Sequence, residues 1–257
     1  MAFSDRDRAF GAGERSFGIW CSILDSGAAE ILGASGFDWC CVDMQHGLGS
    51  DVNLVPLLQA LDVTGTRAFV RPAWNQAPSI MKALDCGARG IIVPMVNSAA
   101  EAQAASAACR YPPDGFRSWG PSRELMRSPH LSPGRSNDEV TCLVMIETAE
   151  AVEQLDDILA VPGVDGVFVG PSDLAISIGV DPHEMLASPE HARLIGRILT
   201  RCQAREVITG IYCGSTEKAL RWRDLGFQML AVASDIELLG SAAAGALQAV
   251  RPAMAPQ

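Results

Sequence analysis

Short apolar runs recur along the whole chain, and Gly, Pro, Asn, Asp or Ser residues separate them. Runs of this length that are rich in Val, Ile and Leu are typical of strands buried on both faces of a parallel sheet. The runs predict strands near residues 16–22, 38–43, 67–71, 89–94, 140–146, 165–169, 207–212 and 228–233.

Stretches with helical spacing alternate with these runs, so each strand leads into a helix. Right-handed crossovers between such units place successive strands parallel in one sheet. Eight units predict a (β/α)8 TIM barrel formed by one domain, residues 1–257, with a doubly wound open sheet as the alternative. The nucleotide-binding form of that open sheet lacks support, because the sequence contains no GxGxxG or GxxxxGK[ST] segment. The helices are predicted near residues 26–35, 51–62, 75–86, 98–109, 148–160, 188–203, 215–225 and 235–250.

Two segments depart from the regular alternation. Residues 111–139 are rich in Pro, Gly, Ser and Arg, and they read as one long irregular connection. Connections of this length inside a compact domain are usually functional or lie in interfaces. The last helix contains the run Ser-Ala-Ala-Ala-Gly-Ala, whose small side chains permit close packing on its own barrel or on a neighbouring subunit.

The composition indicates a globular cytoplasmic protein. Hydrophobic residues make up 48% of the 257 positions, and the formal net charge is −10. A negative chain without clustered Lys and Arg favours neither nucleic acid nor a membrane surface as a partner. The start of the chain is too charged for a signal peptide, and no apolar run approaches the ~18 residues of a membrane span. The eight cysteines form no C-x-x-C pair, so we expect reduced thiols.

Two carboxylates follow neighbouring predicted strands in the second half of the chain. Glu147 ends one apolar run and Asp173 follows the next. Two acids at strand ends can hold one hard divalent cation and leave its other positions to water or to a chelating 2-oxo acid. Pro171 and Ser172 suit the start of a helical turn, whose backbone N–H groups can bind a ligand carboxylate. Either acid alone reads equally well as a cap or first-turn residue of the next helix.

Polar side chains also end two strands in the first half of the chain. Asp43 and Arg71 have the same strand-face parity as Glu147, so all three can point inward at one rim of a barrel. His46 follows Asp43 by three residues, which suits an Asp–His general-base pair. Arg71 has two readings, a salt bridge to Asp43 or Glu147 and stabilisation of a developing enolate oxygen.

The remaining basic side chains offer no alternative chemistry. Lys82 and Lys218 are the two lysines of the chain, and both fall inside predicted helices. Schiff-base aldol chemistry and PLP catalysis need a lysine in the site, so a metal has to serve as the electron sink. His130, His183 and His191 read as polar surface residues.

Several segments together resemble the HpcH/HpaI aldolases. These are metal-dependent (class II) pyruvate aldolases that include 4-hydroxy-2-oxoheptanedioate aldolase and 2-dehydro-3-deoxyglucarate aldolase. The resemblance runs in order from about residue 16 to residue 250, and its most specific parts are the D-x-x-H-G and G-V-D-G-V-F-V-G-P-S-D-L blocks. The segments are Phe37–Gly47, Val70–Pro72, Val93–Val96, Tyr111–Arg117, Met145–Thr148 and Gly163–Leu174.

The resemblance implies a class II aldolase that joins a 2-oxo acid, pyruvate or hydroxypyruvate, to an aldehyde. It implies a homo-oligomer, often a hexamer built as a trimer of dimers, with the last helix exchanged between subunits. A divalent cation, Mg²⁺, Mn²⁺ or Co²⁺, is expected on Glu147 and Asp173. Arg71 is expected on the enolate, with His46 and Asp43 as the acid–base pair. The residues expected to bind substrate are Trp20, Gly170, Pro171, Ser172 and Asp173, with Trp119 reaching the cleft of a neighbouring subunit.

Two positions depart from the family pattern. Gln45 stands where Glu is common, and Met145 stands where Gln is common. These departures leave the natural substrate open and are the support for a non-catalytic barrel that binds a metal and an oxo acid. A citramalyl- or malyl-CoA-type lyase is a further alternative, which would need the arginines of 117–135 to form a CoA groove.

Overall fold

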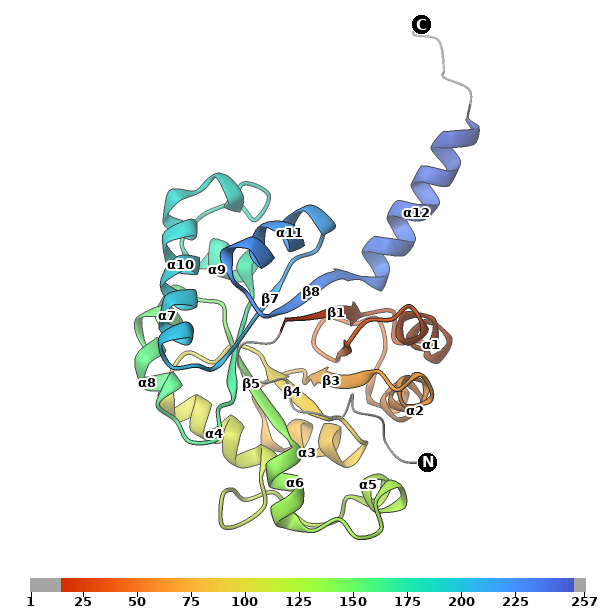
Figure 1. Cartoon of the computed structure of the whole chain (residues 1–257), viewed down its shortest axis with the longest axis vertical. Helices are drawn as coiled ribbons and strands as arrows, with labels where there is room; N and C mark the ends of the chain where they lie inside the picture. The colour runs from red at the N-terminus through yellow and green to blue at the C-terminus, as the bar shows by residue number, and fades with distance from the viewer. Residues whose placement is uncertain (1–14, 252–257) are drawn as a thin grey trace, which may run out of the picture.

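The protein folds as a closed barrel, seen in a computed structural model that describes residues 15–251 (Figure 1). Within that range, eight parallel strands follow one another in chain order until β8 pairs with β1. The predicted (β/α)8 barrel is confirmed and the open sheet is wrong, because closure leaves neither edge strand unpaired. The strands are β1 (Ser16–Cys21), β2 (Trp39–Asp43), β3 (Arg67–Arg71), β4 (Gly90–Val93), β5 (Thr141–Ile146), β6 (Gly166–Val169), β7 (Ile208–Tyr212) and β8 (Met229–Ser234).

Helices surround the barrel, and half of those in the described residues begin at a side chain that caps their first turn. Asp25 accepts hydrogen bonds from two backbone N–H groups of the first helix, and Ser98 and Ser215 cap two others. The helices are α1 (Ser26–Ala34), η2 (Asp51–Asn53), α2 (Leu54–Thr64), α3 (Ala77–Asp85), α4 (Ala99–Cys109), α5 (Ser122–Arg127), α6 (Pro133–Glu139), α7 (Ala149–Glu153), α8 (Leu155–Leu159), α9 (Pro171–Ser177), η3 (Met185–Ala187), α10 (Pro189–Ala204), α11 (Thr216–Leu225) and α12 (Asp235–Val250).

Side-chain alternation along the strands divides the core into two layers. Trp39, Cys41 and Phe69 point inward and pack in the barrel with other large side chains. Cys40 belongs to the second layer, between the strands and the helices. Cys40 and Cys41 therefore face opposite sides of the sheet, as their adjacency on a strand predicts.

The segment 111–139 is more ordered than its sequence indicates. It contains α5 and α6, so the expectation of one irregular connection is wrong. Both helices are short, and ion pairs to the barrel helices hold the segment in place. Arg117 donates to Asp85 at 2.7 Å and Arg127 pairs with Asp62 at 2.8 Å. The arginines of this segment thus stabilise the fold through ion pairs to distant residues. The local periodicity of the sequence does not reveal such contacts.

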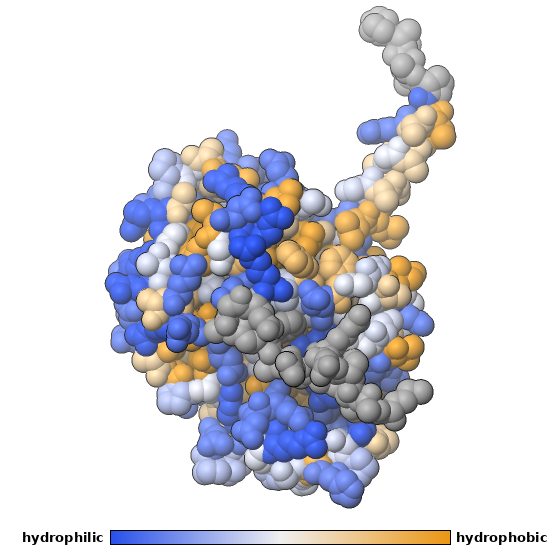
Figure 2. Space-filling model, viewed as in Figure 1, coloured by the Kyte–Doolittle hydropathy of each residue, from blue (hydrophilic) through white to orange (hydrophobic). Residues whose placement is uncertain are grey.

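The last helix, α12, projects away from the barrel (Figure 1). Asp235 is its one buried residue, and Leu238, Leu239 and Leu247 are 45%, 63% and 48% exposed. Figure 2 shows the resulting hydrophobic surface along the projecting helix. Apolar surface of this kind usually marks a site of contact with another protein chain. Over residues 15–251, no helix combines the length and apolar character that a membrane span requires.

Gly18 on β1 lies against the ring of Trp39 inside the barrel, and this close approach yields a stability prediction. A Cβ at position 18 would fall 2.1 Å from the ring atom Cδ2. Gly18→Ala is therefore expected to lower the free energy of unfolding by about 1–3 kcal/mol, as overpacking does in other cores. Urea unfolding followed by circular dichroism measures the change. Gly196→Ala on the exposed side of α10 is the control, because nothing lies within 4 Å of its added Cβ. That variant should keep or gain stability, and an equal loss in both would contradict the packing argument.

Candidate active site

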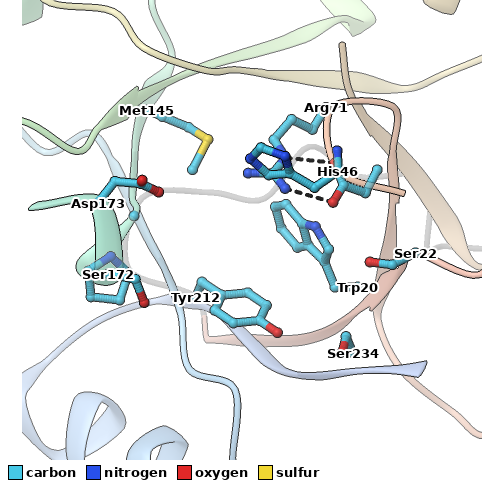
Figure 3. A pocket seen from close by; sticks show the side chains of 12 residues that line it. Trp20, Ser22, His46, Arg71, Met145, Ser172, Asp173, Tyr212 and Ser234 are labelled. Carbon is cyan, nitrogen blue, oxygen red and sulfur yellow. Dashed lines mark hydrogen bonds and ion pairs between the residues drawn. The ribbon is translucent and has the colours of Figure 1, made fainter. Parts of the chain in front are cut away.

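A cavity of about 210 Å³ opens at the carboxyl ends of the strands (Figure 3). Barrel enzymes have their active sites at this rim, where the strands end and the connecting loops begin. The residues that line it come from the ends of β1, β2, β3, β5, β7 and β8 and from the start of α9. The predicted site residues among them are Trp20, Asp43, His46, Arg71, Gly170, Pro171, Ser172 and Asp173.

Glu147 lies directly behind this wall, just after β5, and is 2% exposed. Its Oε1 accepts a hydrogen bond from the backbone N–H of Met95 at 2.7 Å. Met95 adopts a left-handed backbone with φ of 55°, an uncommon conformation for a residue with a side chain. A Cβ at position 170 would fall 2.5 Å from Glu147 Oε2, so Gly170 is the residue that leaves room for the carboxylate.

The charge of Glu147 is costly in this environment. Burial raises the pKa of Glu147, the Met95 N–H opposes that rise, and the neighbouring charge of Asp173 adds to it. The result is a pKa of about 7 instead of 4.5. A buried acid beside a second acid is the electrostatic setting that a bound cation relieves.

The donor atoms of the acidic pair fit a hard divalent cation. Both side chains offer carboxylate oxygens, and Asp173 is exposed to the cavity while Glu147 stands behind it. Over the described residues, no group of three or more His, Cys, Asp or Glu side chains is placed to hold a metal. A cation at this pair would therefore take its remaining ligands from solvent or substrate, unlike structural zinc with its closed set of Cys and His ligands.

Asp43 and Arg71 form a two-pronged ion pair at another part of the cavity wall. They are register partners on β2 and β3. Arg71 donates from Nε to Oδ1 at 2.8 Å and from Nη2 to Oδ2 at 2.6 Å. Burial alone would raise the pKa of Asp43, but the hydrogen bonds and charge of Arg71 outweigh it and lower that pKa. The guanidinium also lies over the ring of Trp20, 5.1 Å from its centroid.

This pairing corrects the expected Asp43–His46 couple. The Asp43 carboxylate contacts Arg71 and the backbone N–H groups of Gln45 and His46, the latter at 3.3 Å. The acid therefore fixes the loop that carries His46, while the imidazole itself lines the cavity. The salt-bridge reading of Arg71 is confirmed, and it holds the guanidinium at the cavity wall.

The segment from Pro171 to Asp173 forms the first turn of α9. Pro171 occupies the first helical position, where its missing N–H costs nothing. The first-turn N–H groups of Ser172 and Asp173 have no partner within the helix, as at any helix start. His191 stands 2.9 Å from the Pro171 carbonyl through Nε2 and is 1% exposed. The expectation that His191 is a surface residue is therefore wrong, since it supports this turn from α10.

Three cavity residues were missed from the sequence: Ser22, Tyr212 and Ser234. Each stands at or just beyond the end of a strand, so a search for polar residues at every strand end would have found them. The Tyr212 hydroxyl donates to Glu237 Oε2 at 2.9 Å. Burial and the neighbouring charge of Glu237 raise the pKa of Tyr212, so this phenol stays protonated near neutral pH.

Two other positions flagged in the sequence lie differently. Trp119 is 45% exposed and lies outside the cavity, packed on Tyr111 with ring centroids 5.1 Å apart. Its contribution to a neighbouring cleft stays a prediction. Met145 is 2% exposed and lines the cavity, and its Cε lies 3.3 Å from a Cβ built at Gly170. An apolar thioether thus borders the acidic pair.

Comparisons with known proteins agree with this architecture. The crystal structure of a HpcH/HpaI aldolase/citrate lyase family protein from Burkholderia cenocepacia J2315 superposes with a TM-score of 0.86 at 31% identity, covering 93% of this chain and 95% of that one. Hydroxypyruvate/pyruvate aldolase of Rhizorhabdus wittichii is 38% identical over 87% of this chain and 89% of its own length. 2-dehydro-3,6-dideoxy-6-sulfogluconate aldolase of Pseudomonas putida is 36% identical over 93% of this chain and 94% of its own. A family model described as HpcH/HpaI aldolase/citrate lyase matches residues 16–242. Since that match extends from β1 into α12, the chain belongs to the HpcH/HpaI aldolase/citrate lyase family.

Proposed function

We propose that this carbon–carbon lyase is a class II aldolase that reversibly joins a 2-oxo acid, pyruvate or hydroxypyruvate, to an aldehyde. The observation that carries the proposal is the acidic pair Glu147 and Asp173, which shares one rim with Arg71 and His46. The two lysines, Lys82 and Lys218, lie on α3 and α11, away from the strand ends. Schiff-base chemistry therefore has no candidate residue.

Glu147 and Asp173 would hold Mg²⁺, Mn²⁺ or Co²⁺. The bound cation supplies the positive charge that stabilises an enolate. The N–H groups of Ser172 and Asp173 bind the carboxylate of the 2-oxo acid at the start of α9. Arg71 has Nε and Nη2 on Asp43, so Nη1 is left to donate to the enolate oxygen.

His46 is the general base in this scheme. It removes a proton from C3 of the 2-oxo acid, and the electron pair of that C–H bond forms the enolate. The enolate carbon then attacks the aldehyde carbonyl, forming the new C–C bond, and the resulting alkoxide takes the proton back. The product is a 4-hydroxy-2-oxo acid, and cleavage follows the same steps in reverse.

The arginines of the 117–135 segment argue against the CoA-lyase alternative. Each has a carboxylate partner within the fold: Arg117 with Asp85, Arg123 and Arg127 with Asp62, and Arg135 with Glu139. A CoA groove needs cations free to meet phosphates. The non-catalytic alternative is also disfavoured, because the departures at Gln45 and Met145 leave the acids, Arg71 and His46 in place.

We further propose a cytoplasmic homo-oligomer, a hexamer arranged as a trimer of dimers, in which α12 packs on a neighbouring barrel. The exposed leucines of α12 support this assembly. An isolated helix is only marginally stable in water, and burying these leucines against a neighbouring barrel would stabilise it. The eight cysteines are buried free thiols, which suits a reducing compartment.

Removal of divalent cations is expected to stop the reaction. Pyruvate release from a 4-hydroxy-2-oxo acid, followed with a coupled dehydrogenase, should fall at least roughly 100-fold in EDTA, because the enolate loses its main stabilising charge. Excess Mg²⁺, Mn²⁺ or Co²⁺ should restore the rate. Turnover that EDTA does not affect would reject this mechanism.

Each acid of the pair is expected to contribute to cation affinity. Glu147→Gln and Asp173→Asn should each weaken Mn²⁺ binding by roughly 100-fold or more, because a neutral amide replaces an anionic ligand. Electron paramagnetic resonance of free Mn²⁺ measures the affinity. Asp181→Asn, at an exposed acid after α9, is the matched control and should bind Mn²⁺ like the parent protein. Unchanged affinity in Glu147→Gln would remove this residue from the metal site.

The raised pKa of Glu147 predicts a pH dependence of cation binding. Below a pKa of about 7 the carboxyl group is protonated, so a proton must leave before the cation can bind. The Mn²⁺ affinity of the substrate-free protein should be nearly constant above pH 7 and fall by about tenfold per pH unit below it. Titrations between pH 5.5 and 8.5 test this. Glu147→Gln should lose the bend near pH 7, and a bend that survives would assign the titration to another group.

A further inference from the structure

Three hydroxyl groups form one side of the cavity, and they have no role in the steps described so far. We propose that Ser22, Tyr212 and Ser234 form a neutral hydroxyl wall that binds aldehydes bearing hydroxyl groups and disfavours aldehydes bearing a second carboxylate. This inference rests on the proposed aldolase function and names its acceptor class.

The hydroxyl wall occupies a separate sector of the rim. Tyr212 ends β7, Ser234 ends β8 and Ser22 follows β1, three strands that are consecutive around the closed barrel. In Figure 3, Ser22 and Ser234 lie across the cavity from Met145 and Asp173. The 2-oxo acid is assigned to the sector of β5 and β6, so the hydroxyl wall faces the part of the cavity left for the aldehyde.

Hydrogen bonds inside the protein fix which way these hydroxyl groups can act. Tyr212 uses its proton on Glu237 Oε2 at 2.9 Å, so its oxygen meets the cavity as an acceptor. Ser234 Oγ accepts from the backbone N–H of Glu237 at 3.2 Å and donates its own proton to the Tyr212 oxygen, a bond that lowers the pKa of Tyr212. The Ser22 hydroxyl lines the cavity without a hydrogen-bond partner among the described residues, so it is the donor of the hydroxyl wall, and Tyr212 is the acceptor. A substrate hydroxyl can use both, whereas a carboxylate can only accept.

The charges behind the hydroxyl wall also disfavour an aldehyde that bears a carboxylate. Glu237 Oε2 accepts from Tyr212 and also from the Ser234 backbone N–H at 2.8 Å, so it is held in place. Asp235 is 5% exposed and accepts from the backbone N–H of Ser22 at 2.9 Å. Both acids would repel an anionic substrate group placed against the hydroxyl wall. Arg71 is the one Lys or Arg side chain in the described lining, and its guanidinium is engaged by Asp43.

The tyrosine is also held from the cavity side. Its ring packs edge-on against Trp20, with centroids 5.6 Å apart, and Trp20 in turn packs on Phe168 at 5.4 Å. With the ring and the hydroxyl both fixed, the acceptor oxygen needs no reordering when substrate binds. Pre-organised polar groups of this kind discriminate strongly against ligands that cannot pair with them.

A panel of aldehydes tests the substrate class on the unaltered protein. With pyruvate and Mn²⁺, kcat/KM for glyceraldehyde should exceed kcat/KM for propanal and for succinic semialdehyde by at least roughly tenfold each. Propanal lacks the hydroxyls, and succinic semialdehyde adds a carboxylate. Equal or greater efficiency with either of these two would overturn the proposal.

Tyr212→Phe tests the contribution of one hydroxyl while keeping the ring. The ratio of kcat/KM for glyceraldehyde to that for propanal should fall by about five- to tenfold. The chain has one other tyrosine, Tyr111, which is 2% exposed and lies outside the cavity. Tyr111→Phe is the matched control and should leave the ratio unchanged. An equal loss for both aldehydes in Tyr212→Phe would indicate a structural role and overturn the proposal.

A separate measurement distinguishes failure of the hydroxyl wall from failure of the aldolase function. Exchange of the C3 protons of pyruvate with deuterium, followed by NMR without any aldehyde, reports the first half of the reaction alone. No Mn²⁺-dependent exchange in the parent protein would reject the aldolase function and the acceptor assignment with it. Normal exchange together with no preference for hydroxylated aldehydes would reject the hydroxyl wall alone.

Discussion

The buried carboxylate of Glu147 is the constraint around which this rim is built. Burial raises its pKa to about 7, the charge of Asp173 adds to that rise, and the Met95 N–H and the charge of Arg71 oppose it. The absence of a side chain at Gly170 makes the position sterically possible. An apolar side chain at this position would make the fold more stable, since burying a charge without a counter-charge costs several kcal/mol. The arrangement fits the cation site proposed for this pair.

The sequence predicts strands and side-chain parity well because both are local properties. Apolar runs located the barrel strands to within about two residues, and alternation placed Asp43 and Arg71 on the inner face. Pairing between strands is not local. The choice of Arg71 over His46 as the partner of Asp43 depends on the register of β2 against β3, which no single segment encodes. Helix α5 was missed for a similar reason, because ion pairs from its arginines to Asp62 on α2 stabilise it. The position of Tyr212 in the cavity wall was not predicted, because an aromatic residue at the end of a strand is usually part of the core.

The junction between β8 and α12 links the cavity to the exposed helix. Ser234 and Glu237 form a capping box that starts α12, and Glu237 also accepts from Tyr212. Asp235 holds the backbone N–H groups of Ser22 and Ile23 on the neighbouring β1 connection. The first turn of α12 thus supports the cavity wall from behind, while the rest of the helix extends outward. Contacts that fix the outer part of α12 would also steady this wall, since a helix transmits orientation along its length.

The distribution of charge around the rim separates two tasks that an aldolase must perform. Acidic and basic side chains occupy the ends of β2, β3 and β5 and the start of α9, where the proposed reaction moves a proton and stabilises an enolate. Neutral hydroxyls occupy β7, β8 and β1, where the proposed acceptor aldehyde needs only to be oriented. Because the two sectors draw on different strands, substitution at Ser22 or Tyr212 can change the acceptor without disturbing Glu147 or Arg71. The barrel can therefore keep the proposed donor chemistry while the acceptor side changes, and Met145, which borders the acids across the cavity from Ser22 and Ser234, belongs to the donor side (Figure 3).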